Sequence, residues 1–163
     1  MTDPLTASVP AADLVRALGA AGQTVATAES LTAGLVAATI AGVPGASAVL
    51  RGGLVVYATD LKSSLAGVSA ELLAAEGPVA ASTAEQLAVG ARTRCAADWG
   101  IGLTGVAGPD GQDGHAVGTV FLGLSSPWHT EVMRLQLSGD RWTIRLTATE
   151  SAVRELLRCV QGG

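Results

Sequence analysis

Apolar and polar positions alternate along this chain with two periods, which distinguish helical from extended segments. Near the amino terminus, apolar residues such as Leu14 and Leu18 recur every three or four positions, which is typical of an amphipathic helix. In the segment 133–137, apolar residues alternate with Arg134 and Gln136, which predicts a strand with one face toward water. Glycine and proline pairs separate such segments along the whole chain.

The order of the segments predicts an α/β fold. Helical and extended patterns interleave, but two late strands adjoin through a short loop, which favours a mixed sheet covered by helices over a purely parallel one. Ser82 and Glu85 form a capping-box pattern at the start of one helix. The predicted helices are residues 10–19, 32–40, 60–65, 70–75, 83–95 and 140–160, and the predicted strands are 24–28, 49–57, 99–104, 117–124 and 131–137.

The last predicted helix carries a continuous apolar stripe, which we expect to face the core. The chain of 163 residues is 48% hydrophobic and 15% charged, which suits one folded domain over residues 1–163. There is no repeat, linker or low-complexity tract. The stripe consists of Trp142, Leu146, Thr149, Val153, Leu156 and Val160.

Charge and cysteine content narrow the function classes. The net charge is −4 with no Lys/Arg-rich run, so we expect neither a nucleic-acid nor a membrane partner. No apolar run is long enough to span a bilayer and no secretory signal opens the chain, so we expect a cytoplasmic location. Cys95 and Cys159 are expected to be free, buried thiols. Cys and His residues lack metal-ligand spacing, so we expect no metal or cofactor.

Two serines stand at breaks between elements. Ser30 follows a predicted strand and precedes a helix, so it is either an N-cap or a group presented where helix N–H groups favour anions. Ser47 precedes the long strand and is either a turn serine or a nucleophile. Lys62 is either a solvated surface cation or, if buried, a neutral base for a serine proton. Tyr57, the only tyrosine, either packs its ring or orients that proton.

Anion or ligand contacts are indicated at two further places. The loop 104–111 follows a strand, and its glycines permit backbone N–H groups to approach a ligand, although it is neither a Walker loop nor a dinucleotide fingerprint. Arg141 and Arg145 share one helical face near the start of a predicted helix. Positive charges there interact unfavourably with the helix dipole, and a bound phosphate would offset this effect. Alternatively, both pair with Asp140 or other acids at the surface.

The chain resembles the CinA C-terminal domain family, which includes stand-alone nicotinamide-nucleotide amidohydrolases. The resemblance covers about residues 10–160 and rests on seven motifs in order. It departs from the family pattern in the loop 111–116 and at 58–61, both beside the expected site. The motifs lie at Thr27–Ser30, Gly45–Ser47, Arg51–Tyr57, Lys62 with Gly67–Val68, Thr104–Gly111, Val117–Val120 and Gly139–Arg141.

The resemblance implies a three-layer α/β/α sandwich, commonly dimeric, that hydrolyses the carboxamide of nicotinamide mononucleotide to nicotinic acid mononucleotide and ammonia. On this basis Ser47 is the expected nucleophile, Lys62 the general base and then acid, and Tyr57 the orienter. Ser30 would assist, and the two serines could exchange roles. Backbone N–H groups near Ser47 or in the 104–108 loop would stabilise the oxyanion. Expected substrate contacts are Glu29, Thr32, Thr104, Gly105, Ala107, Gly108, Arg141 and Arg145.

Two other functions are compatible with the sequence. One is a non-catalytic nucleotide-binding module that keeps the arginines and the glycine loop but hydrolyses nothing. The other is an accessory protein in DNA uptake or damage response, which the family's historical name suggests and the acidic balance argues against.

Overall fold

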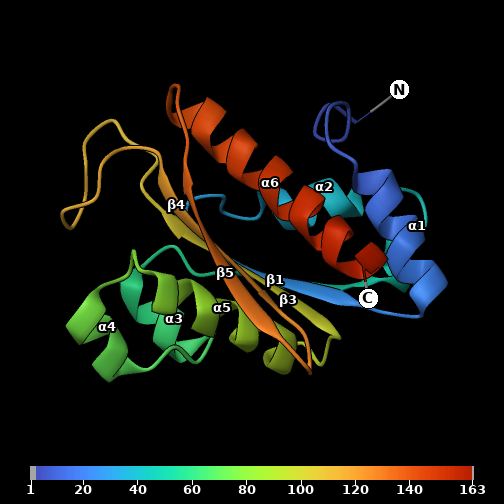
Figure 1. Ribbon diagram of the computed structural model, residues 1–163, viewed down its shortest axis with the longest axis horizontal. Coiled ribbons are helices and arrows are strands. Elements are labelled where there is room, and N and C mark those ends of the chain that lie inside the picture. Colours follow the sequence, from blue (N-terminus) through green and yellow to red (C-terminus); the bar gives the residue numbers. More distant parts are fainter. Residues whose placement is uncertain (1–2, 163) are drawn as a thin grey trace.

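A five-stranded mixed sheet forms the centre of the computed structural model, which describes residues 3–162 (Figure 1). The strand order is β2-β1-β3-β4-β5. β1 pairs in parallel with both β2 and β3, whereas β3–β4 and β4–β5 are antiparallel. The strands are β1 Val25–Glu29, β2 Leu50–Val55, β3 Trp99–Gly105, β4 Thr119–Ser125 and β5 Thr130–Gln136.

Helices cover both faces of the sheet, which confirms the predicted three-layer α/β/α sandwich. In Figure 1, α1, α2 and α6 lie above the sheet and α3, α4 and α5 lie below it. The main apolar core lies between the sheet and the first group of helices, and a second core lies between the sheet and α5. The helices are α1 Ala11–Ala21, α2 Leu35–Ala41, α3 Thr59–Ser64, α4 Ala70–Glu76, α5 Ala81–Arg94 and α6 Arg141–Gly162, with a 3-10 turn, η1, at Ala46–Ala48.

Helix starts differ from the prediction in two places. α2 begins three residues later than predicted, because Ala33 and Gly34 have positive φ angles of 48° and 96° and so make a turn rather than a first helical turn. The capping box at α5 is wrong: the helix begins at Ala81 without a side-chain cap, and the Ser82 hydroxyl donates instead to Glu76 (2.5 Å).

The buried stripe of α6 is rotated from the predicted one. Trp142 is 51% exposed and lies 5.5 Å from the Arg145 guanidinium, a cation–π arrangement, so its prediction as a core residue is wrong. Thr149, Val153 and Leu156 are buried as predicted. The small residues Ala148 and Ala152 complete the buried face, which also includes Ile144.

A strip of glycines lets α5 pack against the sheet at backbone distance. A Cβ atom on Gly100 of β3 would lie 1.9 Å from the Ala88 carbonyl oxygen of α5, and one on Gly102 would lie 2.4 Å from the Ala84 carbonyl oxygen. Gly123 of β4 meets the same Ala84 oxygen at 2.4 Å. Glycine therefore alternates with Ile101 and Leu103 along β3. The large side chains lie on one face of the sheet, and the glycines on the other face let α5 pack closely.

We expect Gly100→Ala to destabilise the fold by more than about 3 kcal/mol, because the new methyl group would overlap backbone that cannot rotate away. Urea denaturation measures the loss as a lower midpoint. Gly19→Ala is the matched control, since Gly19 lies in α1 with open space around its Cβ position. That variant is expected to gain roughly 0.5–1 kcal/mol from helix propensity.

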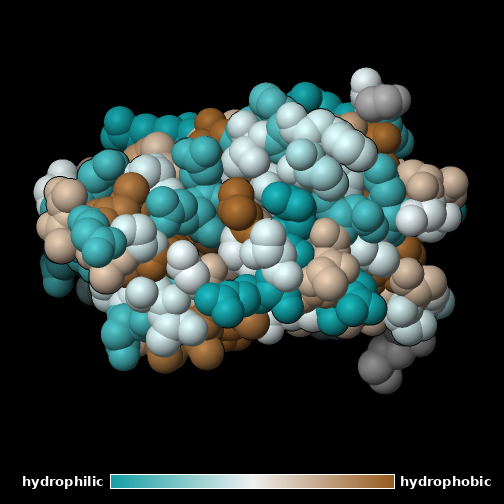
Figure 2. All heavy atoms as spheres, turned by 90° about the horizontal axis from the view of Figure 1, so that it is seen from below, coloured by the Kyte–Doolittle hydropathy of each residue, from teal (hydrophilic) through white to brown (hydrophobic). Residues whose placement is uncertain are grey.

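The outer face of the lower layer is mixed in character. Seen from below, hydrophobic residues lie in small, separate groups among hydrophilic ones (Figure 2). Within residues 3–162, no helix is both long enough and apolar enough to cross a bilayer.

The parallel part of the sheet also determines where a site forms. The carboxyl ends of β1, β2 and β3 lie at the same end of the sheet, because these three strands are parallel. β2 pairs with one side of β1 and β3 with the other, so the chain connections from β1 to β2 and from β2 to β3 run in opposite directions across the sheet. Such a switch point leaves a crevice outside the strand ends, where α/β proteins bind ligands.

Candidate active site

A cavity of about 180 Å³ lies at the carboxyl ends of β1, β2 and β3. Its wall combines the loops that follow these strands with α3 and the first residue of α6. Eight of the twelve residues predicted from the sequence line it, although they come from distant parts of the chain. These eight are Ser30, Tyr57, Lys62, Thr104, Gly105, Ala107, Gly108 and Arg141.

Lys62 is buried at the base of this cavity. It extends from α3, is only 2% exposed, and places its Nζ atom 3.1 Å from the Ser30 hydroxyl oxygen. The same Nζ donates to the carbonyl oxygens of Val56 (2.9 Å) and Tyr57 (3.3 Å). Burial away from water lowers the pKa of the Lys62 ammonium from 10.5 to about 8.

The three partners of Nζ suit both protonation states of the amine. An ammonium has three N–H donors for three acceptors, namely the two carbonyls and the Ser30 hydroxyl. A neutral amine has two donors for the two carbonyls and one lone pair for the serine proton. No carboxylate contacts Nζ among the described residues, so no negative charge offsets the burial that favours the neutral amine. Lys62 can therefore accept a proton from Ser30 and return it.

Ser30 occupies the junction between β1 and the turn into α2. Its backbone N–H donates to the Leu103 carbonyl of β3 (3.0 Å), which anchors the serine to the neighbouring strand. The residue is 8% exposed, so its hydroxyl is reached only through the cavity. Of the two readings of Ser30, N-cap or presented group, this geometry favours the second, because no side-chain cap bond forms at α2.

The structure contradicts the predicted pairing of Ser47 with Lys62. Ser47 is exposed in η1, before β2 begins, whereas Lys62 follows the opposite end of that strand. The six residues of β2 extend over roughly 17 Å, at about 3.4 Å per residue, so the two side chains lie at opposite edges of the sheet. Ser47 does not line the cavity.

Glu29 does not reach the cavity either, because its carboxylate is fully buried beneath the start of α2. It accepts hydrogen bonds from the backbone N–H groups of Gly34 (3.0 Å), Val36 (3.1 Å) and Ala37 (2.9 Å). It also accepts one from the Thr27 hydroxyl (3.0 Å). The predicted substrate contact is therefore replaced by a structural role: Glu29 caps α2 and fixes the turn that carries Ser30.

We expect Glu29→Gln to destabilise the protein by about 2–4 kcal/mol, because an amide nitrogen facing buried N–H groups leaves donors without acceptors. The shift in urea midpoint measures this loss. Glu85→Gln, the same change at an exposed position of α5, should leave the midpoint unchanged. Equal stability of the two variants would contradict the capping role.

Arg141 and Tyr57 close one side of the cavity mouth. The Tyr57 ring is 56% exposed, and its hydroxyl accepts a hydrogen bond from Arg141 Nη2 (2.7 Å). Arg141 Nη1 donates to the Gly108 carbonyl. The Tyr57 phenol thus contacts Arg141 rather than Ser30 or Lys62, and only its carbonyl touches the lysine. Asp140, the residue before Arg141, caps the start of α6. Hydrogen bonds from Thr143 and Trp142 to its carboxylate lower the pKa of Asp140.

Arg145 and Thr32 lie behind the cavity wall rather than in it. Arg145 Nε donates to the Leu31 carbonyl (2.8 Å) and Nη2 donates to the Thr32 carbonyl (3.3 Å). The arginine therefore holds the turn after Ser30 from outside. The Thr32 side chain is fully buried, and its hydroxyl has no hydrogen-bond partner among the described residues.

The glycine-rich loop forms part of the cavity wall. The Thr104 hydroxyl donates to the Pro78 carbonyl (2.5 Å), which joins the loop to the 77–79 segment. A Cβ atom on Gly105 would lie 2.6 Å from the Thr119 carbonyl oxygen, so glycine is needed there for strand packing. The apolar wall residues Leu31, Pro78 and Val79 were not predicted, because no local pattern distinguishes them from core or turn residues.

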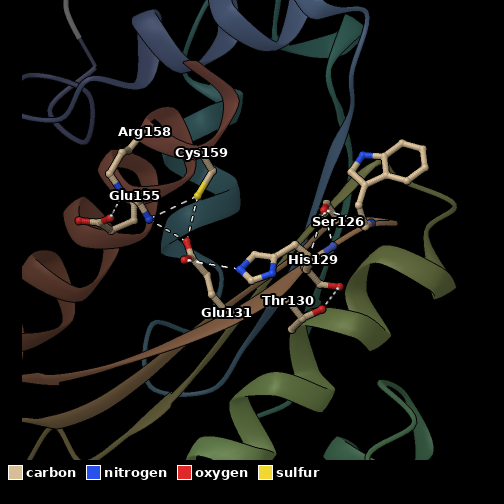
Figure 3. Close-up of polar contacts among 9 residues, drawn as sticks. Ser126, His129, Thr130, Glu131, Glu155, Arg158 and Cys159 are labelled. Atoms are coloured by element: carbon tan, nitrogen blue, oxygen red, sulfur yellow. Dashed lines mark hydrogen bonds and ion pairs between the residues drawn. The ribbon is translucent and has the colours of Figure 1, made fainter. Parts of the chain in front are cut away.

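A second polar cluster lies away from the cavity, between β5 and the end of α6 (Figure 3). Glu131 accepts hydrogen bonds from Arg158 (2.8 Å) and from the Cys159 thiol (3.0 Å), and His129 lies 3.9 Å from its other oxygen. Burial, together with the Glu131 carboxylate, raises the pKa of Cys159 to about 12. This thiol stays protonated at neutral pH and ties α6 to the sheet.

Both cysteines are free, as predicted, but they are half-buried rather than buried. Among residues 3–162, no three His, Cys, Asp or Glu side chains converge into a group that could hold a metal ion.

Comparisons with known proteins agree with this architecture. A family model described as the CinA C-terminal domain matches residues 8–160. A CinA-like protein of Frankia casuarinae is 48% identical over 139 residues, which cover 85% of this chain and 32% of that protein. A putative competence-damage inducible protein of Streptococcus pneumoniae is 46% identical over 126 residues, covering 77% and 30%. The chain thus spans about a third of the length of these relatives.

Solved structures match over nearly the whole chain. The competence/damage inducible protein CihA of Agrobacterium tumefaciens has a TM-score of 0.88 at 33% identity and covers 93% of both chains. A CinA superfamily protein of Klebsiella pneumoniae has a TM-score of 0.91 at 29% identity, covering 94% of this chain and 96% of that one.

Proposed function

Because the chain belongs to the CinA C-terminal domain family, we propose that it is an amidohydrolase that converts nicotinamide mononucleotide to nicotinic acid mononucleotide and ammonia. The observation that carries this proposal is the contact between Lys62 Nζ and the Ser30 hydroxyl, at 3.1 Å in a cavity that buries the amine. A serine beside a lysine of lowered pKa is an activated nucleophile that requires no histidine.

The proposed reaction passes through an ester on Ser30. Lys62 takes the hydroxyl proton while the serine oxygen attacks the carboxamide carbon, and the carbonyl π electrons move to oxygen. When the C–N bond breaks, Lys62 gives that proton to the nitrogen, which leaves as ammonia. Water then attacks the ester with Lys62 as base again, which releases the carboxylate and restores the Ser30 hydroxyl.

The size of the cavity supports a ring-borne carboxamide as the group that enters. A dry protein cavity of about 150 Å³ accommodates a benzene molecule, so 180 Å³ suits one six-membered ring and a small substituent. The ribose and phosphate of a nucleotide would then remain at the mouth. Arg141 lies there, and its described hydrogen-bond partners are neutral, so its positive charge is available to a phosphate.

The proposed catalytic roles differ from the sequence prediction at Ser30, Ser47 and Tyr57. Ser30 replaces Ser47 as nucleophile, which was the alternative left open by the resemblance. Tyr57 orients Arg141 at the mouth and does not relay a proton, because its hydroxyl is bonded to the guanidinium. Lys62 keeps its predicted role as general base and then acid.

The decisive experiment incubates the purified chain with nicotinamide mononucleotide and measures ammonia and nicotinic acid mononucleotide in equal amounts. Ser30→Ala, prepared in parallel, serves as the blank for contaminating amidases. Stabilisation of the protein by the nucleotide without product would instead favour the non-catalytic binding module. Salt-dependent DNA retention without either effect would favour the accessory role in DNA uptake or damage response.

A further inference from the structure

We propose that the backbone N–H groups of Leu31 and Ala107 together form the oxyanion hole of this site. The inference rests on the proposed function, because it names the groups that would stabilise the charge developing on the substrate oxygen. When the Ser30 oxygen bonds to the carboxamide carbon, the carbonyl oxygen becomes an anion, and the serine proton moves to Lys62. That anion needs donors that are already in place.

The local geometry around Ser30 provides the first donor. The serine stands on a sharp turn between a strand and a helix, and such nucleophile turns use the N–H of the following residue as an oxyanion donor. The N–H of Ser30 itself is occupied by the Leu103 carbonyl at 3.0 Å. Leu31 is therefore the first residue of the turn whose N–H is available to a ligand.

Both proposed donors belong to buried residues, and neither N–H has a hydrogen-bond partner among residues 3–162. Leu31 is 3% exposed and Ala107 is 5% exposed, and both line the cavity. Buried N–H groups without a partner are rare in proteins, so two in one small cavity indicate a polar ligand atom between them.

The two donors come from adjacent strands. β1 and β3 are paired in parallel, with Glu29 opposite Leu103, so the turn after β1 and the loop after β3 leave the sheet side by side. In the separate α/β-hydrolase fold, the nucleophile turn likewise takes its second donor from another loop at the carboxyl ends of the strands. Gly108 is a weaker candidate, because the residue is more exposed than Ala107.

The test replaces each N–H by an ester oxygen, which removes the donor and keeps the side chain. Leu31→leucic acid and Ala107→lactic acid, introduced by nonsense suppression, are expected to lower kcat by about 10²–10³-fold each, with KM changed less than about threefold. Ala116→lactic acid is the matched control, since Ala116 is exposed, lies in the same loop and donates no backbone hydrogen bond among residues 3–162. It should keep full activity.

A second measurement separates this inference from the proposed substrate. A fluorophosphonate reacts with an activated serine irrespective of the natural substrate, and its phosphoryl oxygen would occupy the same hole. Both ester variants should therefore phosphonylate Ser30 about 10²–10³-fold more slowly than the unmodified chain. If the chain does not hydrolyse nicotinamide mononucleotide but both variants show this slowing, the proposed substrate is wrong and the proposed oxyanion hole is supported. Unchanged labelling in either variant, or no labelling of Ser30 at all, would overturn the inference.

Discussion

Ser30→Ala is expected to lower the rate of ammonia release from nicotinamide mononucleotide by at least about 10⁴-fold, because removing a nucleophile leaves only the remainder of the catalytic site. The substituted alanine keeps the backbone bond to Leu103 and removes only the hydroxyl that contacts Lys62. KM is expected to change little, since the cavity wall is unaltered. Steady-state kinetics with a coupled ammonia assay provide both constants.

Ser47→Ala is the matched partner of this experiment. It makes the same chemical change at the other serine of the predicted pair, exposed in η1 at the far edge of the sheet. We expect its kcat and KM to stay within about twofold of the unmodified chain, as is usual for a surface substitution. Loss of activity in Ser47→Ala together with retention in Ser30→Ala would reverse the assignment of the nucleophile.

Lys62→Met is expected to lower kcat by about 10³–10⁴-fold, because methionine fills the same buried space without a proton acceptor. In the unmodified chain, kcat/KM should rise about tenfold per pH unit below pH 8 and level off above it, as the ammonium loses its proton. Lys62→Arg should be equally inactive, since a guanidinium stays charged. A flat pH profile between pH 6 and 9 would contradict this role of Lys62.

The same lysine makes stability depend on pH in a defined direction. Its pKa is about 8 in the folded chain and near 10.5 when unfolded, so between these values the unfolded chain binds more protons. The contribution of Lys62 to the free energy of unfolding therefore rises with pH over this interval, by up to about 3 kcal/mol. Below pH 8 the burial penalty is fully present. Urea titrations of Lys62→Met should lack this rise.

Most of the fold could be predicted from periodicity alone. All predicted helices and strands occur within a few residues of their expected bounds, because turn residues separate segments with distinct periods. The errors have local physical causes. The predicted apolar stripe of α6 included Trp142, whereas the buried face includes Ala148 and Ala152, whose small side chains permit close packing. Depth of packing depends on the partner element and is not encoded in spacing.

The candidate site was predicted less completely, because residue type does not reveal which sheet edge a loop occupies. Ser30 and Ser47 both stand beside strands, and only their order relative to the strand differs. In a parallel sheet the crevice forms where strands end, so the serine that follows a strand is favoured over the serine that precedes one. Glu29 shows the complementary difficulty, since its four hydrogen-bond donors include three backbone groups with no sequence signature.

The position of the lone tyrosine has a practical consequence for studying ligands. Tyr57 is the only phenol in the chain, and its hydroxyl is hydrogen-bonded to the guanidinium at the cavity mouth. Any anion that draws Arg141 away changes the surroundings of that single phenol. Raman spectroscopy of the phenol bands would thus report occupancy without a label and without background from other tyrosines.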